Sequence, residues 1–250
     1  MHDHATTETA PGHATLWSGR YPAHTGVVLN EIGVADPQSP LLLGRGGGAS
    51  PYRFRGSALF DWMRTRDQFS RALSVSRKDR GAILPLGRAR QQVYWYSLDG
   101  RFTTSRYYAD TLPAWVQQFN ARNFLKPYLG AEWNTLLAAS QYPEKDSVPI
   151  ESQGKDYVFP HKLDTEVRAA GTNFTEFPWM DDVTVDMALA GVNALDLGLE
   201  VGRKYQCGDL PAGLTGRGHG GVCVCCHRGG RPDTAHPARH RTRQRLDVGA

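Results

Sequence analysis

An abrupt change of composition after residue 206 limits this chain's fold more than any other sequence feature. Residues 207–250 contain no Phe, Tyr, Trp, Ile or Met, so they can bury little apolar surface. They hold seven Arg and three Asp, which gives the whole net charge of +4, because residues 1–206 carry 22 basic and 22 acidic side chains. We therefore expect the folded domain within residues 1–206, and an aberrant tail, disordered or poorly packed, over residues 207–250.

The composition of the tail raises two hypotheses: a shifted reading frame and a zinc knuckle. Its wealth of Arg, Gly, His, Cys and Pro is typical of a GC-rich gene translated in the wrong frame, and we keep that hypothesis open. A structural zinc site needs two ligand pairs at suitable spacing. The run CVCCHRGG has neither the spacing within a pair nor a second pair at a distance. All four cysteines of the chain lie in the tail: Cys207, Cys223, Cys225 and Cys226, with His227 beside the last. The pattern does not favour a native zinc site.

Several partner classes are disfavoured by the sequence. The tail lacks the interleaved aromatic residues of a nucleic-acid-binding segment, so we expect no nucleic acid partner. No stretch approaches the roughly 18 consecutive apolar residues of a membrane helix, so we expect no membrane segment. The start, MHDHATTETA, lacks the basic and apolar regions of a secretory signal. Localisation and oligomeric state stay unknown at this stage.

Residue patterns predict an α/β domain. Residues 57–65 predict a helix with Leu59, Phe60 and Met63 on one face, and 72–76 predict a buried strand that leads into a charged turn and a second apolar run. A helix, a strand and a charged turn in this order are typical of a sheet whose strand ends form a site.

Two further helices are expected after these elements. The first starts near Thr111, its candidate N-cap, and repeats apolar residues at helical spacing (Leu112, Trp115, Val116 and Phe119). The second covers 182–202, with one apolar side (Val185, Ala188, Leu189, Val192 and Leu195).

The remaining segments are expected to be irregular. Residues 35–56 predict a loop, and their run GRGGGAS lacks the Gly-Lys-Ser/Thr ending and the clear preceding strand of a phosphate loop. An aromatic-rich insertion falls within about residues 88–181, and residues 124–181 show few regular periods.

Four polar residues are candidates for chemistry. Thr9 is a hydroxyl at a turn, and it becomes a nucleophile only if a base or a metal lowers its pKa. Asn30 could donate an amide N–H to an anion. Lys78 and Arg80 follow the strand and suit a phosphoryl group, since an ammonium and a planar guanidinium both bind phosphate. Taken singly, each has a structural alternative: a turn residue for Thr9, and a solvated surface turn for the Lys-Asp-Arg triplet.

Two separated motifs resemble one enzyme superfamily. The stretch TAPGHATLWSGRYPAHTGVVLN resembles the alkaline phosphatase superfamily, in its type I phosphodiesterase/nucleotide pyrophosphatase branch. The later stretch SVSRKDRGAILPLGRARQQVYWYSLDGRFTTSRYYADTLPAWVQQFN is similar to the single-Thr, phosphate-irrepressible alkaline phosphatases. The resemblance covers about residues 5–204, and it implies a central, mostly parallel sheet flanked by helices, incomplete in this chain.

The resemblance also implies roles for the four candidates. Thr9 matches the nucleophile that becomes phosphorylated, and 21 positions later Asn30 matches the donor to a phosphate oxygen. Lys78 and Arg80 match the cations that favour a dianionic monoester over a diester. In the family two zinc ions activate the Thr and the leaving group, and Thr9 would contact them through its hydroxyl. The implied partner is a small phosphate ester, and relatives of this kind are typically periplasmic or secreted.

The chain departs from the family pattern in its metal ligands. The family's first metal-binding Asp lies on a strand before the nucleophile, and His2, Asp3 and His4 do not replace it, because they stand almost beside Thr9 with no strand. We find no Asp-x-x-x-His in the expected Gly-rich setting after residue 206. We therefore expect a fragment of a partial domain, 1–206, that retains Thr9 but not the other ligands, and retains little zinc.

Three functions remain open from the sequence. The first is a phosphoric monoester hydrolase that works through a phosphothreonine with two zinc ions, present here as an inactive fragment. The second is a phosphodiesterase or nucleotide pyrophosphatase of the same superfamily, which Lys78 and Arg80 disfavour because a diester carries less charge. The third is a defective product or a phosphate-binding remnant without enzymatic activity.

Overall fold

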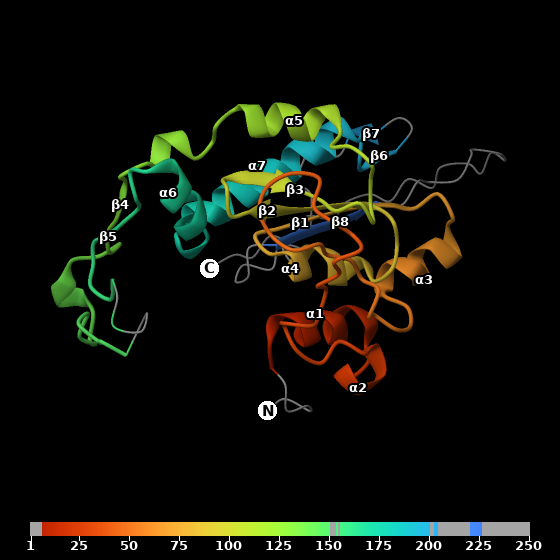
Figure 1. Ribbon diagram of the computed structural model, residues 1–250, viewed down its shortest axis with the longest axis horizontal. Helices are drawn as coiled ribbons and strands as arrows, with labels where there is room; N and C mark the ends of the chain where they lie inside the picture. Colours follow the sequence, from red (N-terminus) through yellow and green to blue (C-terminus); the bar gives the residue numbers. More distant parts are fainter. Residues whose placement is uncertain (1–6, 151–153, 155, 201–202, 205–220, 227–250) are drawn as a thin grey trace, which may run out of the picture.

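The computed structural model describes residues 7–150, 154, 156–200, 203–204 and 221–226. A central sheet of four strands has the order β3-β2-β1-β8, and helices cover both of its faces (Figure 1). These strands are β1 (Arg71–Ser76), β2 (Gln92–Ser97), β3 (Arg101–Thr103) and β8 (Gly221–Cys226). The α/β class expected from the sequence is confirmed.

The sheet is mixed in the described residues, whereas a mostly parallel sheet was expected. β1 and β2 are parallel, with Leu73 opposite Gln92, and α4 (Asp79–Ile83) and the short helix η1 (Leu84–Leu86) connect them. β2 and β3 are antiparallel because a three-residue turn joins them, in which Gly100 adopts φ +83° and its N–H donates to the Ser97 carbonyl. β8 pairs antiparallel with β1.

Strand β8 lies in the segment that was expected to pack little. Residues 221–226 pair along the whole of β1, which has β2 on its other side. The edge of a strand presents unpaired N–H and C=O groups that recruit another extended segment, and the Val- and Cys-rich run GVCVCC supplies one. The rest of the 207–250 prediction, including Cys207 and His227, lies outside the described residues.

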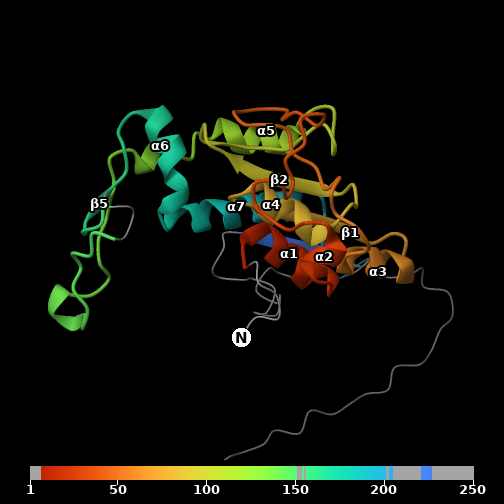
Figure 2. The same ribbon diagram turned by 60° about the horizontal axis from the view of Figure 1, so that its bottom comes forward.

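The alternation of side chains along the strands separates two apolar cores. On one face Leu73 and Val75 of β1 and Tyr94 and Tyr96 of β2 pack with helices α5 (Ala114–Ala121) and α7 (Trp179–Ala194). Ala72, Val93 and Trp95 point to the opposite face, because successive strand side chains alternate between faces. There they meet apolar side chains of α1 (Thr9–Ser18), α3 (Leu59–Arg66), α4 and η1. This gives a helix–sheet–helix sandwich, and α1 and α4 lie side by side in both views of it (Figure 2).

The helices on the α5/α7 face confirm the expected elements and correct their details. Helix α5 (Ala114–Ala121) begins after Pro113, not at Thr111, because the N–H-less proline fits a helix start. Val116 and Phe119 are buried as expected. Helix α7 (Trp179–Ala194) confirms part of the expected apolar side, because Ala188 is buried and Val192 and Leu195 are partly buried against the same core. Val185 and Leu189 are exposed. The buried residues of the helix are Met180, Val183, Thr184, Met187, Ala188 and Gly191.

The helices on the α1/α4 face cover the sheet near the candidate site. They are α1 (Thr9–Ser18), α2 (Pro22–Thr25), α3 (Leu59–Arg66) and α4. In α3 only Phe60 is buried, and Leu59 is exposed, contrary to the expected apolar face. The expected charged turn after β1 is the first turn of α4, with Lys78 as its N-cap.

The other described elements are short. Residues 35–56 form a loop as expected, closed by a bridge between Ala35 and Ala49. The aromatic-rich region after α5 holds several brief elements, which Figure 1 shows extending away from the sheet: η2 (Lys126–Tyr128), β4 (Glu132–Trp133), η3 (Ala139–Gln141), β5 (His161–Lys162), α6 (Val167–Asn173) and η5 (Phe174–Glu176). A last pair of two-residue strands is β6 (Leu199–Glu200) and β7 (Arg203–Lys204).

Candidate active site

Thr9 is the first residue of helix α1, not a turn residue. Pro11 fits in the first turn because its missing N–H would have no partner within the helix. The helix ends at Gly19, whose left-handed φ of +65° lets its N–H donate to the Thr15 carbonyl. Small residues line the buried side of α1 (Ala10, Pro11, Ala14 and Ser18), so the helix lies close to the layer beneath it. Thr9 itself is half-buried.

Asn30 is held against the first turn of α1. Its side-chain Oδ1 accepts a hydrogen bond of 2.8 Å from the Ala10 backbone N–H. The backbone N–H of Asn30 donates to Glu8 Oε2 at 2.7 Å. Because the Ala10 N–H can only donate, Oδ1 must face it, and the Nδ2 amino group then points the other way. Asn30 and Thr9 are therefore neighbours, with an amide donor oriented away from the helix turn.

Lys78 and Arg80 lie at the end of β1, where α4 begins. The Lys78 N–H donates to Ser76 Oγ at 3.3 Å. Burial, followed by the charges of Arg77 and Arg80, lowers the pKa of Lys78 below its ordinary value of 10.5. Crowding of like charges lowers the pKa of an ammonium because it disfavours the charged form. The same crowding makes this end of β1 a place where an anion would be stabilised.

The guanidinium of Arg80 has partners for only some of its donors within the described residues. Its Nη1 lies 3.3 Å from Asp79 Oδ1, with about a quarter of the side chain exposed. Its Nε is buried and lacks a hydrogen-bond partner within the described residues. Buried donors in native proteins nearly always have a partner. An oxygen-rich ligand would supply the acceptor that the described part of the chain does not.

Helix α1 packs against α4, which brings the two halves of the candidate site to one face of the sheet. The contact includes His13 of α1 and Gly81 of α4. Glu176 of η5 also lies near enough for its charge to oppose part of the Lys78 pKa shift, and the preceding Thr175 carbonyl accepts from Arg77 Nη1 at 2.5 Å. Sequence reasoning missed Glu8, His13 and Arg77, and only His13, one helical turn after Thr9, carries a signal in the sequence.

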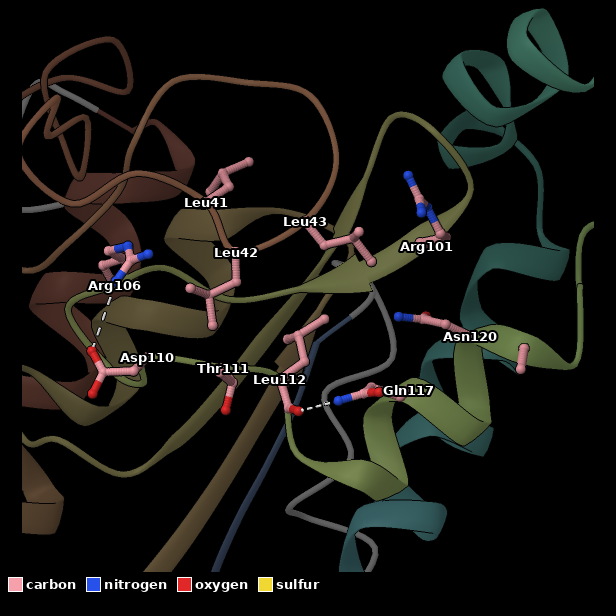
Figure 3. Close-up of a pocket in the computed structure, with 11 residues that line it drawn as sticks. Leu41, Leu42, Leu43, Arg101, Arg106, Asp110, Thr111, Leu112, Gln117 and Asn120 are labelled. Atoms are coloured by element: carbon pink, nitrogen blue, oxygen red, sulfur yellow. Dashed lines mark hydrogen bonds and ion pairs between the residues drawn. The ribbon is translucent and has the colours of Figure 1, made fainter.

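The two cavities described in the structure lie elsewhere. One, of about 610 Å³, is bounded by the loop around Leu42, by Arg101 of β3 and by helix α5 (Figure 3). Its polar groups mostly bind the protein itself: Asn120 holds the backbone of Phe102, and Gln117 donates to the Leu112 carbonyl. The other, of about 400 Å³, lies between Gly44 and Arg168. Neither includes Thr9, Asn30, Lys78 or Arg80. Because the resemblance gives all four a role at one phosphate, we predict that they converge on one pocket.

The described residues do not fit a zinc pair. Within them, no group of three or more His, Cys, Asp or Glu side chains is placed to hold a metal ion. His2, Asp3 and His4 lie outside the described residues. Among the described helices, none combines the length and apolar character needed to cross a bilayer.

Comparison with known proteins places this fold and these residues in one family. The model of the type I phosphodiesterase / nucleotide pyrophosphatase family matches residues 1–167. The chain therefore belongs to this family, within the alkaline phosphatase superfamily.

Two curated relatives are named alkaline phosphatases. Alkaline phosphatase PhoV of Synechococcus elongatus is 31% identical over 211 residues, which cover 77% of this chain and 38% of PhoV. Alkaline phosphatase PafA of Elizabethkingia meningoseptica is 29% identical over 219 residues, covering 79% of this chain and 40% of PafA. The chain thus spans well under half of the length of these relatives.

A solved structure of a PafA variant superposes with a TM-score of 0.68 at 26% identity, covering 79% of this chain and 42% of that one. This variant has four substituted residues, a Thr, an Asn, a Lys and an Arg. By their numbers the Thr and Asn stand 21 positions apart, and the Lys and Arg two positions apart.

Proposed function

We propose that this chain carries the phosphate-binding part of an alkaline-phosphatase-type site, with phosphoric monoesters as the substrate class. The observation that carries the proposal is that Arg77, Lys78 and Arg80 lie together where β1 ends and α4 begins, and that burial first and the charges of the two arginines second lower the pKa of Lys78. A monoester is dianionic near neutral pH, so several cations at one point favour it over a singly charged diester.

The comparisons support the same assignment. Thr9 and Asn30 are 21 positions apart, and Lys78 and Arg80 are two apart, which are the residue types and spacings substituted in the PafA variant. In the reaction of a complete site of this kind, the Thr9 hydroxyl loses its proton and its oxygen bonds to phosphorus, while the ester oxygen leaves with its electron pair and takes up a proton. Water then attacks phosphorus, the Thr9 oxygen leaves and regains a proton, and inorganic phosphate is released. Asn30, Lys78 and Arg80 hold the non-bridging oxygens in both steps.

Activation of Thr9 is the part that the described residues do not supply. The family resemblance implies zinc, which lowers the pKa of a bound hydroxyl, but the described residues do not fit such a metal site. We therefore expect this chain to bind phosphate through Asn30, Lys78 and Arg80 while hydrolysing esters negligibly. Binding that is equal in the ground state and the transition state does not speed the chemical step.

The test measures both properties on the full 250-residue chain. Titration with inorganic phosphate should show binding that the Lys78→Ala/Arg80→Ala double variant loses. Hydrolysis of an aryl phosphate with added zinc should equal that of the Thr9→Ala variant. Zinc-dependent turnover that disappears in Thr9→Ala, together with two bound zinc ions per chain, would overturn the expected inactivity. Absence of phosphate binding would overturn the proposed site.

A diester substrate is the second candidate, because the matching family model includes phosphodiesterases. Competition between phenyl phosphate and a diphenyl phosphate ester distinguishes the two. Tighter binding of the diester would favour the phosphodiesterase assignment. Phosphate binding without turnover is the result that the proposal expects, so the inactive fragment and the non-enzymatic, phosphate-binding remnant predict the same outcome for this chain.

A further inference from the structure

His13 connects the nucleophile's helix turn to the cationic turn of α4. Its Nδ1 lies 2.8 Å from the Thr9 carbonyl oxygen. A carbonyl only accepts, so Nδ1 carries the proton and donates it to Thr9. The tautomer is thereby fixed for the neutral ring, and the Nε2 side of the ring faces α4.

The ring of His13 lies over Gly81 of α4. A Cβ atom at Gly81 would stand 3.9 Å from His13 Nε2, an ordinary van der Waals contact, but only 2.5 Å from Ser76 Oγ, so the glycine makes room for Ser76. Ser76 Oγ in turn accepts the N–H of Lys78. The side chain of His13, the bare backbone of Gly81 and the hydroxyl of Ser76 therefore form one packed connection between Thr9 and Lys78.

This connection supplies what small residues on α1 do not. Ala10 and Ala14 let α1 approach the layer beneath it. An alanine methyl group is too small, however, to prevent the helix from sliding along its own axis. A ring hydrogen-bonded to its own helix and seated over a glycine defines one position. A displacement of about 1 Å can cost a catalytic site a large factor, so a fixed position at Thr9 matters for function.

We infer that His13 is a positioning residue, which holds Thr9 and its helix turn in register with Lys78 and Arg80. The inference rests on the proposed function, because the register matters only if the two turns bind one phosphate. It assigns a role to a side chain outside the four matched residues.

The experiment compares the binding of inorganic phosphate by the full chain and by its variants. Binding is measured by ³¹P NMR titration. In His13→Asn the amide Nδ2 stands near the position of imidazole Nδ1, so it can still donate to the Thr9 carbonyl. His13→Ala cannot. We expect His13→Ala to weaken binding by about tenfold, the change of equilibrium constant that the loss of one hydrogen bond produces, and His13→Asn to recover most of it. Leu16→Ala, on the exposed side of the same helix, should leave binding unchanged.

A second measurement separates positioning from general loss of structure. In the Lys78→Ala single-variant background, which keeps Arg80 and Asn30, His13→Ala should weaken the remaining phosphate binding by much less than tenfold, because residues that act through one another are not additive. Gly81→Ala, which shifts α4 against Ser76, should weaken phosphate binding without removing His13, and it serves if His13→Ala does not fold.

The outcomes separate this inference from the proposed function. If the unmodified chain does not bind phosphate, the proposed function is wrong. If the unmodified chain binds phosphate through Lys78 and Arg80 but His13→Ala binds equally well, only the inference about His13 is wrong. Equal weakening by His13→Asn and His13→Ala would likewise refute the role of the Nδ1 hydrogen bond.

Discussion

Asn30 should have two separable roles, one in stability and one in phosphate binding. The N-cap residue of α1, Glu8, makes no side-chain capping bond, and Asn30 Oδ1 accepts the Ala10 N–H in its place. Loss of an N-capping acceptor costs about 0.5–2 kcal/mol. Ala10 is fully buried, so water cannot replace the missing acceptor, and the upper part of that range applies.

The perturbation is Asn30→Ala, measured by urea unfolding and by differential scanning calorimetry. We expect a loss of about 1–2 kcal/mol in the free energy of unfolding, which lowers the Tm of a chain of this size by about 2–8 °C. Phosphate binding should fall in the same variant, because the Nδ2 donor is also removed.

Asn30→Asp is the matched control, since it keeps an acceptor for Ala10 and removes the amide donor. It should recover most of the stability and none of the phosphate binding. Leu29→Ala, at the exposed neighbouring position, should change neither property. An Asn30→Ala protein as stable as the unmodified chain would refute the capping role, and an Asn30→Asp protein that binds phosphate normally would refute the donor role.

Further predictions concern two glycines and two titrating groups. Gly12→Ala should stabilise the protein by about 0.5–1 kcal/mol, because a Cβ there meets nothing within 4 Å and Ala suits a helix better than Gly. Gly81→Ala should destabilise the protein by about 1–3 kcal/mol, because the new Cβ would approach Ser76 Oγ to 2.5 Å. The urea midpoints of the two variants check both predictions, and a change of midpoint in the opposite direction would contradict either one. The Glu166 carboxylate accepts the N–H groups of Arg168 and Ala169, which lowers its pKa below 4.5. Its contribution to stability should therefore be present above that value and be lost as the pH falls through the folded pKa, and Glu166→Gln should show a smaller loss of Tm in acid. Burial and neighbouring arginines lower the pKa of Lys78, so phosphate affinity should fall as the pH rises through this lowered pKa; a Lys78→Met variant that kept the same slope would contradict the assignment.

The sequence predicts the elements of this fold better than it predicts their faces. The strand at 72–76 is found as β1, because a short run of small and apolar residues between polar segments favours a buried strand. In α7, Val185 and Leu189 of the expected apolar side are exposed, since the helix meets the sheet through Met187 and Gly191. Several faces of α7 are apolar enough to pack, and only the approach of Leu73 and Trp115 to Gly191 selects one.

The same division applies to the candidate site. The type and spacing of Thr9 and Asn30 can be recognised in the sequence, whereas the bond from Ala10 to Asn30 cannot, because it depends on where the helix begins. The expected turn at Thr9 was wrong for this reason: Pro11 and Gly12 are typical of turns, but here they occupy the first turn of a helix. The link from Arg77 to Thr175 spans 98 residues, and no local pattern predicts a contact of that range.

The hydrogen bonds in the two halves of the candidate site close loops of very different length, so the two halves should form at different times during folding. The Ala10–Asn30 bond joins residues 20 apart in sequence, while the Arg77–Thr175 bond joins residues 98 apart. The entropy of loop closure grows as (3/2)RT ln n, so the longer closure costs about 1.4 kcal/mol more. Local closures form early and long closures late. Thr9 and Asn30 would then assemble as a local unit during synthesis, and the connection of η5 to the turn that holds Lys78 and Arg80 would follow once Thr175 has joined the chain.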